Sequence, residues 1–503
     1  MSSQAIIQKG RWWLAGIAAI SALAFLSGCM VGPDYSRPAV PASEQYDPQA
    51  QRQLSASGGV VGAQHISPGQ EILGDWWSAF GSAKLDRVIH RAIDGNLDLA
   101  AASATIAQAN EAILSAKGGL YPQLDYAGQL GRARSNNQGF APATTASYHT
   151  VGLLLNYDFD VFGGTKRLVE QQAALADFQK RRYDAAYLTL TGDTANQAIL
   201  LASARAQMEA VEILLNDDRT NLDLVRSARL TGSASQVDVA LAETQLSLDQ
   251  TLLPPLAQQC STARHALSVL AGTGPNDWVA PDFDLTDFTL PSNLPVSLPS
   301  EVARNRPDIL EAEAELHAAS AAIGVATADL YPHLTLSGFI SEAAVAASSP
   351  FGAGSALWSI GAELAGPVFH GGTLEANRRG AVDSYKASLA IYRETVVTSL
   401  GQVADVLQAI CHDEEEYSSQ DQALDSAGIS LKLNQEGYKE GEISVLQVLD
   451  SERAYEQALL GQIRAKTAQY LDITELSVAL GGNARGAFQR REEFSYGAQA
   501  SFK

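Results

Sequence analysis

A duplicated motif is the feature that most constrains this fold. Leu120-Tyr121-Pro122-Gln123-Leu124 returns as Leu330-Tyr331-Pro332-His333-Leu334, an offset of 210 residues (331 minus 121). Each copy runs on to a pair of glycines, Gly163-Gly164 in the first and Gly371-Gly372 in the second. A long internal repeat of this kind indicates two copies of one structural unit.

The duplicated segment has the alternation of a β-hairpin. Its apolar residues alternate with mostly polar ones, in the order Thr150, Val151, Gly152, Leu153, Leu154, Leu155, Asn156, Tyr157, Asp158, Phe159. A period of two predicts strands with one apolar face, and we expect them at about 121–134, 147–161, 331–343 and 356–369. Runs of about 10 residues suit tilted membrane strands. A soluble edge hairpin is the alternative that the pattern leaves open.

Two very long helices follow the hairpins. From Gly164 to about Arg229 there is no proline and Gly192 is the one internal glycine, so a single helix of about 100 Å is expected at about 1.5 Å per residue. Its distal part has a coiled-coil seam in which Asp218 is the one polar break, with the seam formed by Leu201, Ala204, Met208, Val211, Leu215, Leu222 and Val225. A helix of an ordinary globular bundle is the alternative, and the length disfavours it.

The second long helix is expected from Thr373 to about Tyr438. Each long helix should turn at a glycine, Gly232 or Gly441, and be followed by a return helix. Pro254-Pro255 should kink the first return helix.

The chain divides into five segments on this reading. A stretch rich in Pro, Ser, Gly and Gln precedes the first repeat and should be extended rather than a domain. The segments are a signal peptide at 1–28, the extended segment at 29–73, a first repeat at 74–272, a second repeat at 297–482 and a disordered tail at 483–503.

The first segment resembles a bacterial lipoprotein signal. A basic start precedes an apolar run from Trp12 to Leu26, and small residues lead to Cys29 in Leu26-Ser27-Gly28-Cys29. A run of about 15 residues is short for a membrane span. We therefore expect cleavage before Cys29 and acylation of that residue, which anchors the chain to membrane lipid. Met30 follows, so the aspartate that retains many lipoproteins at the inner membrane is absent there.

Composition excludes some classes of function. The 503 residues carry a formal charge of -21, which would repel a nucleic-acid backbone. The three cysteines make no disulfide framework. Cys260 lies 28 residues after Gly232 and Cys411 lies 30 residues before Gly441. Their similar distance from the turns permits a disulfide between them in an oxidising compartment.

An enzyme is a competing class, but the sequence lacks its common motifs, with no Gly-x-Ser-x-Gly, His-Glu-x-x-His, phosphate loop or Cys-x-x-Cys. His412 and Glu416 are one helical turn apart and could bind a cation, although a solvated acidic face explains them as well and no second His or Cys supports a site. We expect no catalytic residues, metal or cofactor.

Four amphipathic strands cannot enclose a pore by themselves. An open edge in hydrocarbon leaves backbone groups unsatisfied, and single-chain barrels begin at about eight strands. Two chains would give eight strands and a filled interior, whereas three would give twelve and leave a lumen. The pattern therefore favours a homotrimer in which the long helices continue the tube.

Several motifs in order resemble a known family. They are Cys29-Met30-Val31-Gly32-Pro33-Asp34-Tyr35, Asp75-Trp76-Trp77, Asn96-Leu97-Asp98-Leu99, Arg306-Pro307-Asp308-Ile309 and both Tyr-Pro-x-Leu strands. Together they resemble the NodT-type outer-membrane lipoproteins of tripartite efflux pumps, in the TolC superfamily. The resemblance implies a mainly helical chain in a homotrimer with a 12-stranded outer-membrane β-barrel and a 12-helix periplasmic α-barrel. It also implies a periplasmic adaptor and an inner-membrane pump of the resistance-nodulation-division class as partners.

The resemblance also assigns roles to the helix turns. The adaptor-contact positions at the periplasmic tip are Arg229, Leu230, Thr231, Gly232, Ser235, Tyr438, Gly441 and Ser444. The simpler reading is that each glycine just ends a helix. The candidates for the channel gate are Leu431, Asn434 and Gln435. The implied function is passive conduction of drugs or other small molecules across the outer membrane, and the alternatives are a type I secretion duct and a lipid-anchored coiled-coil scaffold.

Overall fold

The computed structural model describes residues 30–39, 45–47, 60–61, 64–70, 74–135, 144–344, 356–482, 484 and 486–489. The signal peptide and Cys29 therefore lie outside the described residues. The chain divides into two compact units. A sheet unit comprises residues 1–38, 105–179 and 312–392, and a helical unit comprises residues 39–104, 180–311 and 393–503.

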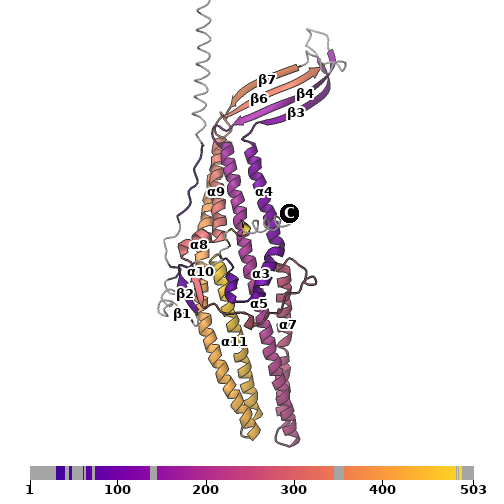
Figure 1. The fold of residues 1–503 in the computed structure, drawn as a ribbon, viewed down its shortest axis with the longest axis vertical. Helices are drawn as coiled ribbons and strands as arrows, with labels where there is room; N and C mark the ends of the chain where they lie inside the picture. The colour runs from indigo at the N-terminus through magenta and orange to yellow at the C-terminus, as the bar shows by residue number, and fades with distance from the viewer. Residues whose placement is uncertain are drawn as a thin grey trace, which may run out of the picture. The chain divides into compact units, whose positions relative to one another are not determined.

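The sheet unit contains one antiparallel sheet in the order β3-β4-β6-β7 (Figure 1). Its strands are β3 (Gln123–Ser135), β4 (Thr144–Phe159), β6 (His333–Ala344) and β7 (Ala356–Ala365). The two predicted hairpins are confirmed, and β4 pairs with β6 to join them. Within the described chain, β3 and β7 are the edges of this sheet.

The register places most of the large apolar residues of the four strands on one face. Tyr126 lies opposite Leu153, Leu153 opposite Ile340, and Ile340 opposite Trp358. The face also carries Leu124, Leu130, Val151, Leu155, Tyr157, Leu334, Leu336, Ile360 and Leu364. Tyr126 and Trp358 are 86% and 74% exposed, so none of the residues that the structure describes covers this face. The other face bears mostly polar residues such as Gln123, Asn156 and Ser337.

The helices have the lengths that the sequence predicts. Two medium helices, α4 (Leu97–Gly118) and α9 (Pro307–Ala328), precede the hairpins. Two continuous long helices follow them: α5 (Gly164–Leu230) has 67 residues and α10 (Thr373–Glu440) has 68. Among the described residues, no helix has both the length and the apolar composition needed to cross a membrane.

The return helices differ from one another. In the second repeat α11 (Val445–Ala479) is continuous, whereas in the first the chain forms α6 (Gln236–Gln250), a break at Thr251-Leu252, and α7 (Leu253–Leu270). Pro254-Pro255 lie in the first turn of α7, where the missing N–H groups would have had no partner in the helix. The predicted interruption of the return helix at the prolines is therefore confirmed. It is a two-residue break between α6 and α7, and the helix then resumes to Leu270 as expected.

An aromatic core holds the helical unit together. Trp76, Trp77 and Phe80 come from the short 3-10 helix η1 (Trp76–Phe80), which precedes α3 (Ala83–Gly95). Phe80 contacts the rings of Phe288 and Tyr470, at centroid distances of 6.1 and 6.2 Å. The Tyr470 hydroxyl donates to the Phe288 carbonyl at 3.0 Å, so this buried hydroxyl of the core is satisfied.

A small sheet in the helical unit is absent from the sequence prediction. It contains β1 (Val60–Val61), β2 (Gln64–Pro68) and β5 (Asn293–Val296), with β2 and β5 parallel. The second 3-10 helix, η2 (Leu285–Asp287), and α8 (Pro299–Asn305) flank β5. Part of the expected extended segment therefore pairs with the linker between the repeats. Strands of five residues or fewer have too few alternating positions to show a period.

The start of the C-terminal tail is folded. Ala484, Ala487 and Phe488 are buried. The Asp184 carboxylate of α5 accepts from the backbone N–H groups of Gly486 and Phe488, at 3.2 and 3.5 Å. The prediction of disorder from residue 483 is thus wrong for these residues, because a buried carboxylate binds their backbone and their three apolar side chains are buried. Residues after 489 lie outside the described chain.

Candidate functional site

The first helix turn joins α5 to α6. Gly232 has a φ of 82°, in the left-handed region. Ser233 N donates to Ala228 O at 2.9 Å, the six-residue closure of a Schellman motif. Ser235 then begins α6 with a capping box: its Oγ accepts from Asp238 N at 3.2 Å, and its N–H donates to Asp238 Oδ2 at 2.7 Å.

The second turn, between α10 and α11, is built in the same way. Gly441 has a φ of 78°, and Glu442 N donates to Gly437 O at 2.9 Å. Ser444 N donates to Gln447 Oε1 at 3.1 Å. The two repeats therefore end their long helices with the same local structure, although Lys439-Glu440 stands where the first repeat has Leu230-Thr231.

The turns present mainly exposed side chains. Leu230 is 90% exposed, which is unusual for a large apolar residue at a helix end. The other exposed positions of the predicted contact set are Arg229, Thr231, Gly232, Ser235, Gly441 and Ser444. Tyr438 differs from them because it is half-buried, and burial, with the nearby Asp238 carboxylate, raises the pKa of its hydroxyl.

An apolar cluster beside the turns joins the two helix hairpins. It comprises Leu222 and Val225 of α5, Val239 and Ala242 of α6, and Val445 and Leu449 of α11, with Tyr438 of α10 packed against it. Figure 1 shows the two hairpins side by side within the helical unit. The positions of the two turns are therefore set by contacts made inside one chain.

The gate candidates lie on α10, with Leu431 about two turns before Tyr438 and Asn434 and Gln435 about one turn before it. Gln435 donates a hydrogen bond to the Glu452 carboxylate of α11. Leu431 lines a small cavity between the helices together with Asp218 and Glu452. Asn434 is half-buried. Leu431 and Gln435 thus face α5 and α11 of the same chain. A movement of α10 would change these contacts.

The structure also describes the two cysteines and the candidate cation pair of the sequence analysis. Cys260 and Cys411 are both free thiols, so the disulfide that the sequence permits is not formed in this structure. Cys260 is buried with its Sγ 3.6 Å from Met208 Sδ. His412 Nδ1 lies 3.9 Å from a Glu415 carboxylate oxygen. No group of three or more His, Cys, Asp or Glu in the described part of the chain is placed to hold a metal ion.

The sequence prediction misses an arginine that fixes the segment after Cys29. Arg167 lies near the start of α5 and is 1% exposed. Its guanidinium donates to Val31 O at 3.1 Å, Gly32 O at 3.3 Å and Asp34 Oδ1 at 2.7 Å, and it contacts Glu170 at 2.7 Å. The partners are more than 130 residues apart in sequence, so no local pattern could have indicated this contact.

Two glycines allow the same segment to lie against the helices. A Cβ on Gly32 would approach Gly324 Cα to 2.4 Å, and a Cβ on Gly324 would approach Arg167 Cγ to 2.6 Å. Tyr35 stacks on His317 of α9 with ring centroids 4.3 Å apart, and Arg37 forms an ion pair with Glu313 at 2.6 Å. The Gly32-Pro33-Asp34-Tyr35 motif is therefore a docking segment for the helices of the sheet unit.

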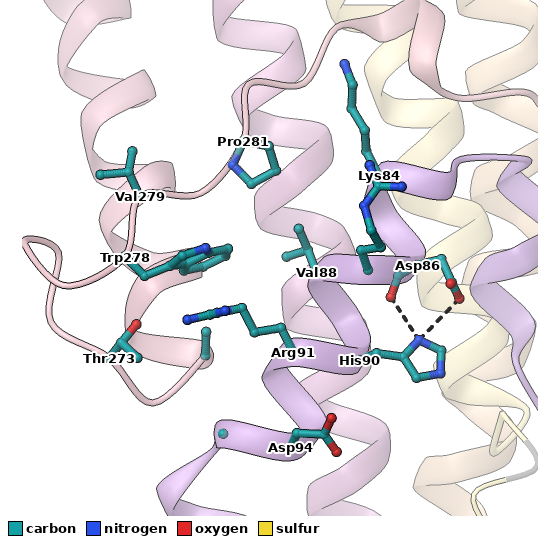
Figure 2. Close-up of a pocket in the computed structure, with 13 residues that line it drawn as sticks. Lys84, Asp86, Val88, His90, Arg91, Asp94, Thr273, Trp278, Val279 and Pro281 are labelled. Carbon is teal, nitrogen blue, oxygen red and sulfur yellow. Dashed lines mark hydrogen bonds and ion pairs between the residues drawn. The ribbon is translucent and has the colours of Figure 1, made fainter.

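A cavity beside α3 has a different character. It has a volume of about 1000 Å³ and lies between α3 and the 271–281 segment (Figure 2). Arg91 lies over the Trp278 ring at 4.7 Å, and His90 is turned toward Asp86, with Nδ1 3.3 Å from its carboxylate. These groups are already partnered by one another, and the arrangement contains no nucleophile with an adjacent base.

The family comparison agrees with this architecture. The model of the family described as "Outer membrane efflux protein" matches residues 88–273 and 298–482, one block in each repeat. The chain belongs to the outer membrane efflux protein family. As a member of it, the chain is an efflux component of the outer membrane that extends into the periplasm, and the predicted resemblance, fold and location are confirmed.

Individual relatives cover nearly the whole chain. The pyoverdine export outer membrane protein OpmQ of Pseudomonas aeruginosa is 30% identical over 418 residues, which is 81% of this chain and 87% of OpmQ. The cation efflux system protein CusC of Escherichia coli is 29% identical over 459 residues, 91% of this chain and 97% of CusC. The solved structure of the outer-membrane channel OprN has a TM-score of 0.83 and 25% identity, and the match covers 90% of this chain and 99% of OprN.

Proposed function

We propose that three copies of this chain form the outer-membrane exit duct of a tripartite efflux pump and conduct solutes passively. The observation that carries the proposal is the four-stranded sheet with an exposed apolar face and two edges, β3 and β7. Unpaired edge groups in hydrocarbon cost several kcal/mol each, so the edges require partners. Three copies supply about twelve strands, enough to leave a lumen.

The proposed duct continues through the long helices to the two turns. There the exposed Leu230 and its neighbours would meet a periplasmic adaptor, and an inner-membrane pump would load the solute. Transport then needs diffusion through water and no chemistry in this chain. Acylated Cys29 would anchor the docking segment in the outer membrane, with Arg167 holding that segment against the helices.

The class of cargo is best described as small molecules. OpmQ is named for pyoverdine export and CusC for cation efflux, and both are about equally similar to this chain. Since relatives with the same architecture serve different cargoes, we assign the choice of substrate to the pump rather than to the duct.

Conductance of purified trimers in planar bilayers tests the proposal. Leu431→Ser and Asn434→Ala should raise the leak current if α10 closes the periplasmic end. The same leucine-to-serine change at Leu433, which is 62% exposed, is the matched control. Trimers that never conduct would favour the scaffold, whereas conduction with an unchanged leak in both variants would remove the gate assignment alone. Mass spectrometry of the same preparation should find acyl chains on Cys29.

A further inference from the structure

Four buried carboxyl groups gather where the two helix hairpins meet. Asp218 of α5, Asp249 of α6, and Glu452 and Glu456 of α11 are 6%, 6%, 6% and 9% exposed. They line one small cavity with Leu214, Asp217, Gln245 and Leu431. Asp218, the one polar residue in the coiled-coil seam, thus belongs to a cluster to which both hairpins contribute residues.

Little positive charge offsets these carboxyl groups. None of the described residues lining the cavity is a lysine, arginine or histidine. Arg453 of α11 faces the cluster. Its Nη2 donates to Gln245 Oε1 at 2.8 Å and its Nη1 lies 3.5 Å from the Asp450 carboxylate, while its charge lowers the pKa of Glu456 against the larger effect of burial. Gln245 in turn donates to Asp249 at 2.8 Å. The uncharged side chains of Leu431 and Gln435 face the cluster from α10, and the exposed Asp217 of α5 also lines the cavity.

The cluster favours bound protons. The carboxyl group of Asp249 lies beside those of Asp218 and Glu456 in one cavity. Ionised carboxylates can only accept hydrogen bonds, so a hydrogen bond between two of these groups needs a proton on one of them. Asp218 Oδ2 has no partner among the described residues although the side chain is nine-tenths buried. A buried, unpaired negative charge is costly unless it is neutralised.

The acidities agree with this geometry. Burial raises the pKa of Glu452 to about 7, against the hydrogen bonds from Asn221 and Gln435 that lower it. Burial and Asp249 raise the pKa of Glu456 to about 7. The pKa of Asp218 is also raised, first by burial and then by Asp249.

We propose that Asp218, Asp249, Glu452 and Glu456 form a proton-binding site that latches the α5–α6 hairpin to the α10–α11 hairpin. One interaction that crosses between the hairpins depends on it directly: the contact between the Asp249 and Glu456 carboxyl groups is a hydrogen bond only when they share a proton. Asn221 of α5 also donates to Glu452 of α11, and this bond persists when Glu452 is ionised. When the protons leave, several negative charges remain in one small cavity. Their repulsion and their demand for water both favour separation of the hairpins.

The direction of the pH effect follows from linkage. Asp218, Glu452 and Glu456 have higher pKa values in the packed state than when hydrated, so the packed state binds more protons. The stabilisation is complete below the ordinary carboxyl pKa of about 4 and is lost as the pH rises through about 7. Acid therefore closes the latch and alkali releases it. If the hairpin turns are the closed end of a duct, as the proposed function holds, alkaline pH favours opening.

Hydrogen–deuterium exchange of the purified full chain tests the latch without measuring conduction. Peptides from α6 and the first turns of α11 are compared at pH 6 and pH 8 after correction for the chemical exchange rate. Opening should increase by up to about tenfold per pH unit for each proton released. Asp218→Asn, which mimics the protonated acid in shape, should remove most of this increase, and Glu456→Gln should do the same independently.

Asp223→Asn is the matched control, because it removes the same charge from α5 at a side chain that is 79% exposed. The control should keep the pH response of the unaltered chain. The proposal is overturned if the unaltered chain shows no pH response in these peptides, or if Asp218→Asn and Asp223→Asn respond alike. A latch that behaves as expected in trimers that do not conduct would refute the proposed function and leave the proton site intact.

Discussion

Replacing Arg167 by methionine should release the docking segment that follows Cys29. Methionine keeps much of the length of the side chain but removes its donors. The carbonyls of Val31 and Gly32 lose their partner at about 1 kcal/mol each. Loss of the ion pairs with Asp34 and Glu170 adds only about 0.5–1 kcal/mol to this cost. The value is small because the Asp34 side chain is 88% exposed and Glu170 keeps its contact with His317. The docked state should therefore lose about 2–4 kcal/mol.

Chymotryptic cleavage after Tyr35 measures this loss, because cleavage of a segment that opens and closes rapidly follows the population of its open state. A loss of 2–4 kcal/mol corresponds to about 30- to 1000-fold faster cleavage at about 1.36 kcal/mol per factor of ten. Lys166→Met is the control, since Lys166 is the exposed neighbour of Arg167. A change of less than about threefold for Arg167→Met would show that the aromatic contact of Tyr35 and the Arg37 ion pair hold the segment without it.

Two further predictions concern the second repeat. Because Gly441 has a φ of 78°, Gly441→Val should destabilise the turn by about 1–2 kcal/mol and lower the melting temperature of the purified protein. Gly441→Asn should lower it less, since asparagine adopts the left-handed conformation more readily. Equal losses of melting temperature in the two variants would contradict a backbone cause. Asp472 of α11 is 8% exposed, and its pKa is raised by burial and by Asp413. A buried acid with a raised pKa destabilises the folded protein as it ionises, so the melting temperature should fall as the pH rises from about 6 to about 9. Asp472→Asn should flatten this fall, and the exposed control Asp450→Asn should not. A fall that is unchanged in Asp472→Asn would refute the argument.

Periodic patterns determined much of the fold. The alternation in the duplicated segment predicts four strands and the face that each residue occupies, because a strand's side chains alternate whatever surrounds it. The absence of proline in two long stretches predicts α5 and α10 to within a few residues, and Gly232 and Gly441 mark their ends. These features depend on neighbours in sequence, so the sequence contains the information directly.

Other features required the tertiary structure. The sequence shows Asp218 as a polar residue in an apolar seam, but Asp249, Glu452 and Glu456 join it only when two hairpins more than 200 residues apart pack together. The contacts of Arg167 were also not visible in the sequence, because its acceptors lie on the docking segment, far from it along the chain. The parallel pairing of β2 with β5 and the folded start of the tail are likewise long-range contacts. Local periodicity thus set the elements and their faces, whereas the burial of charged groups was decided by packing, because the free energy of a charge depends on all the groups that exclude water from it.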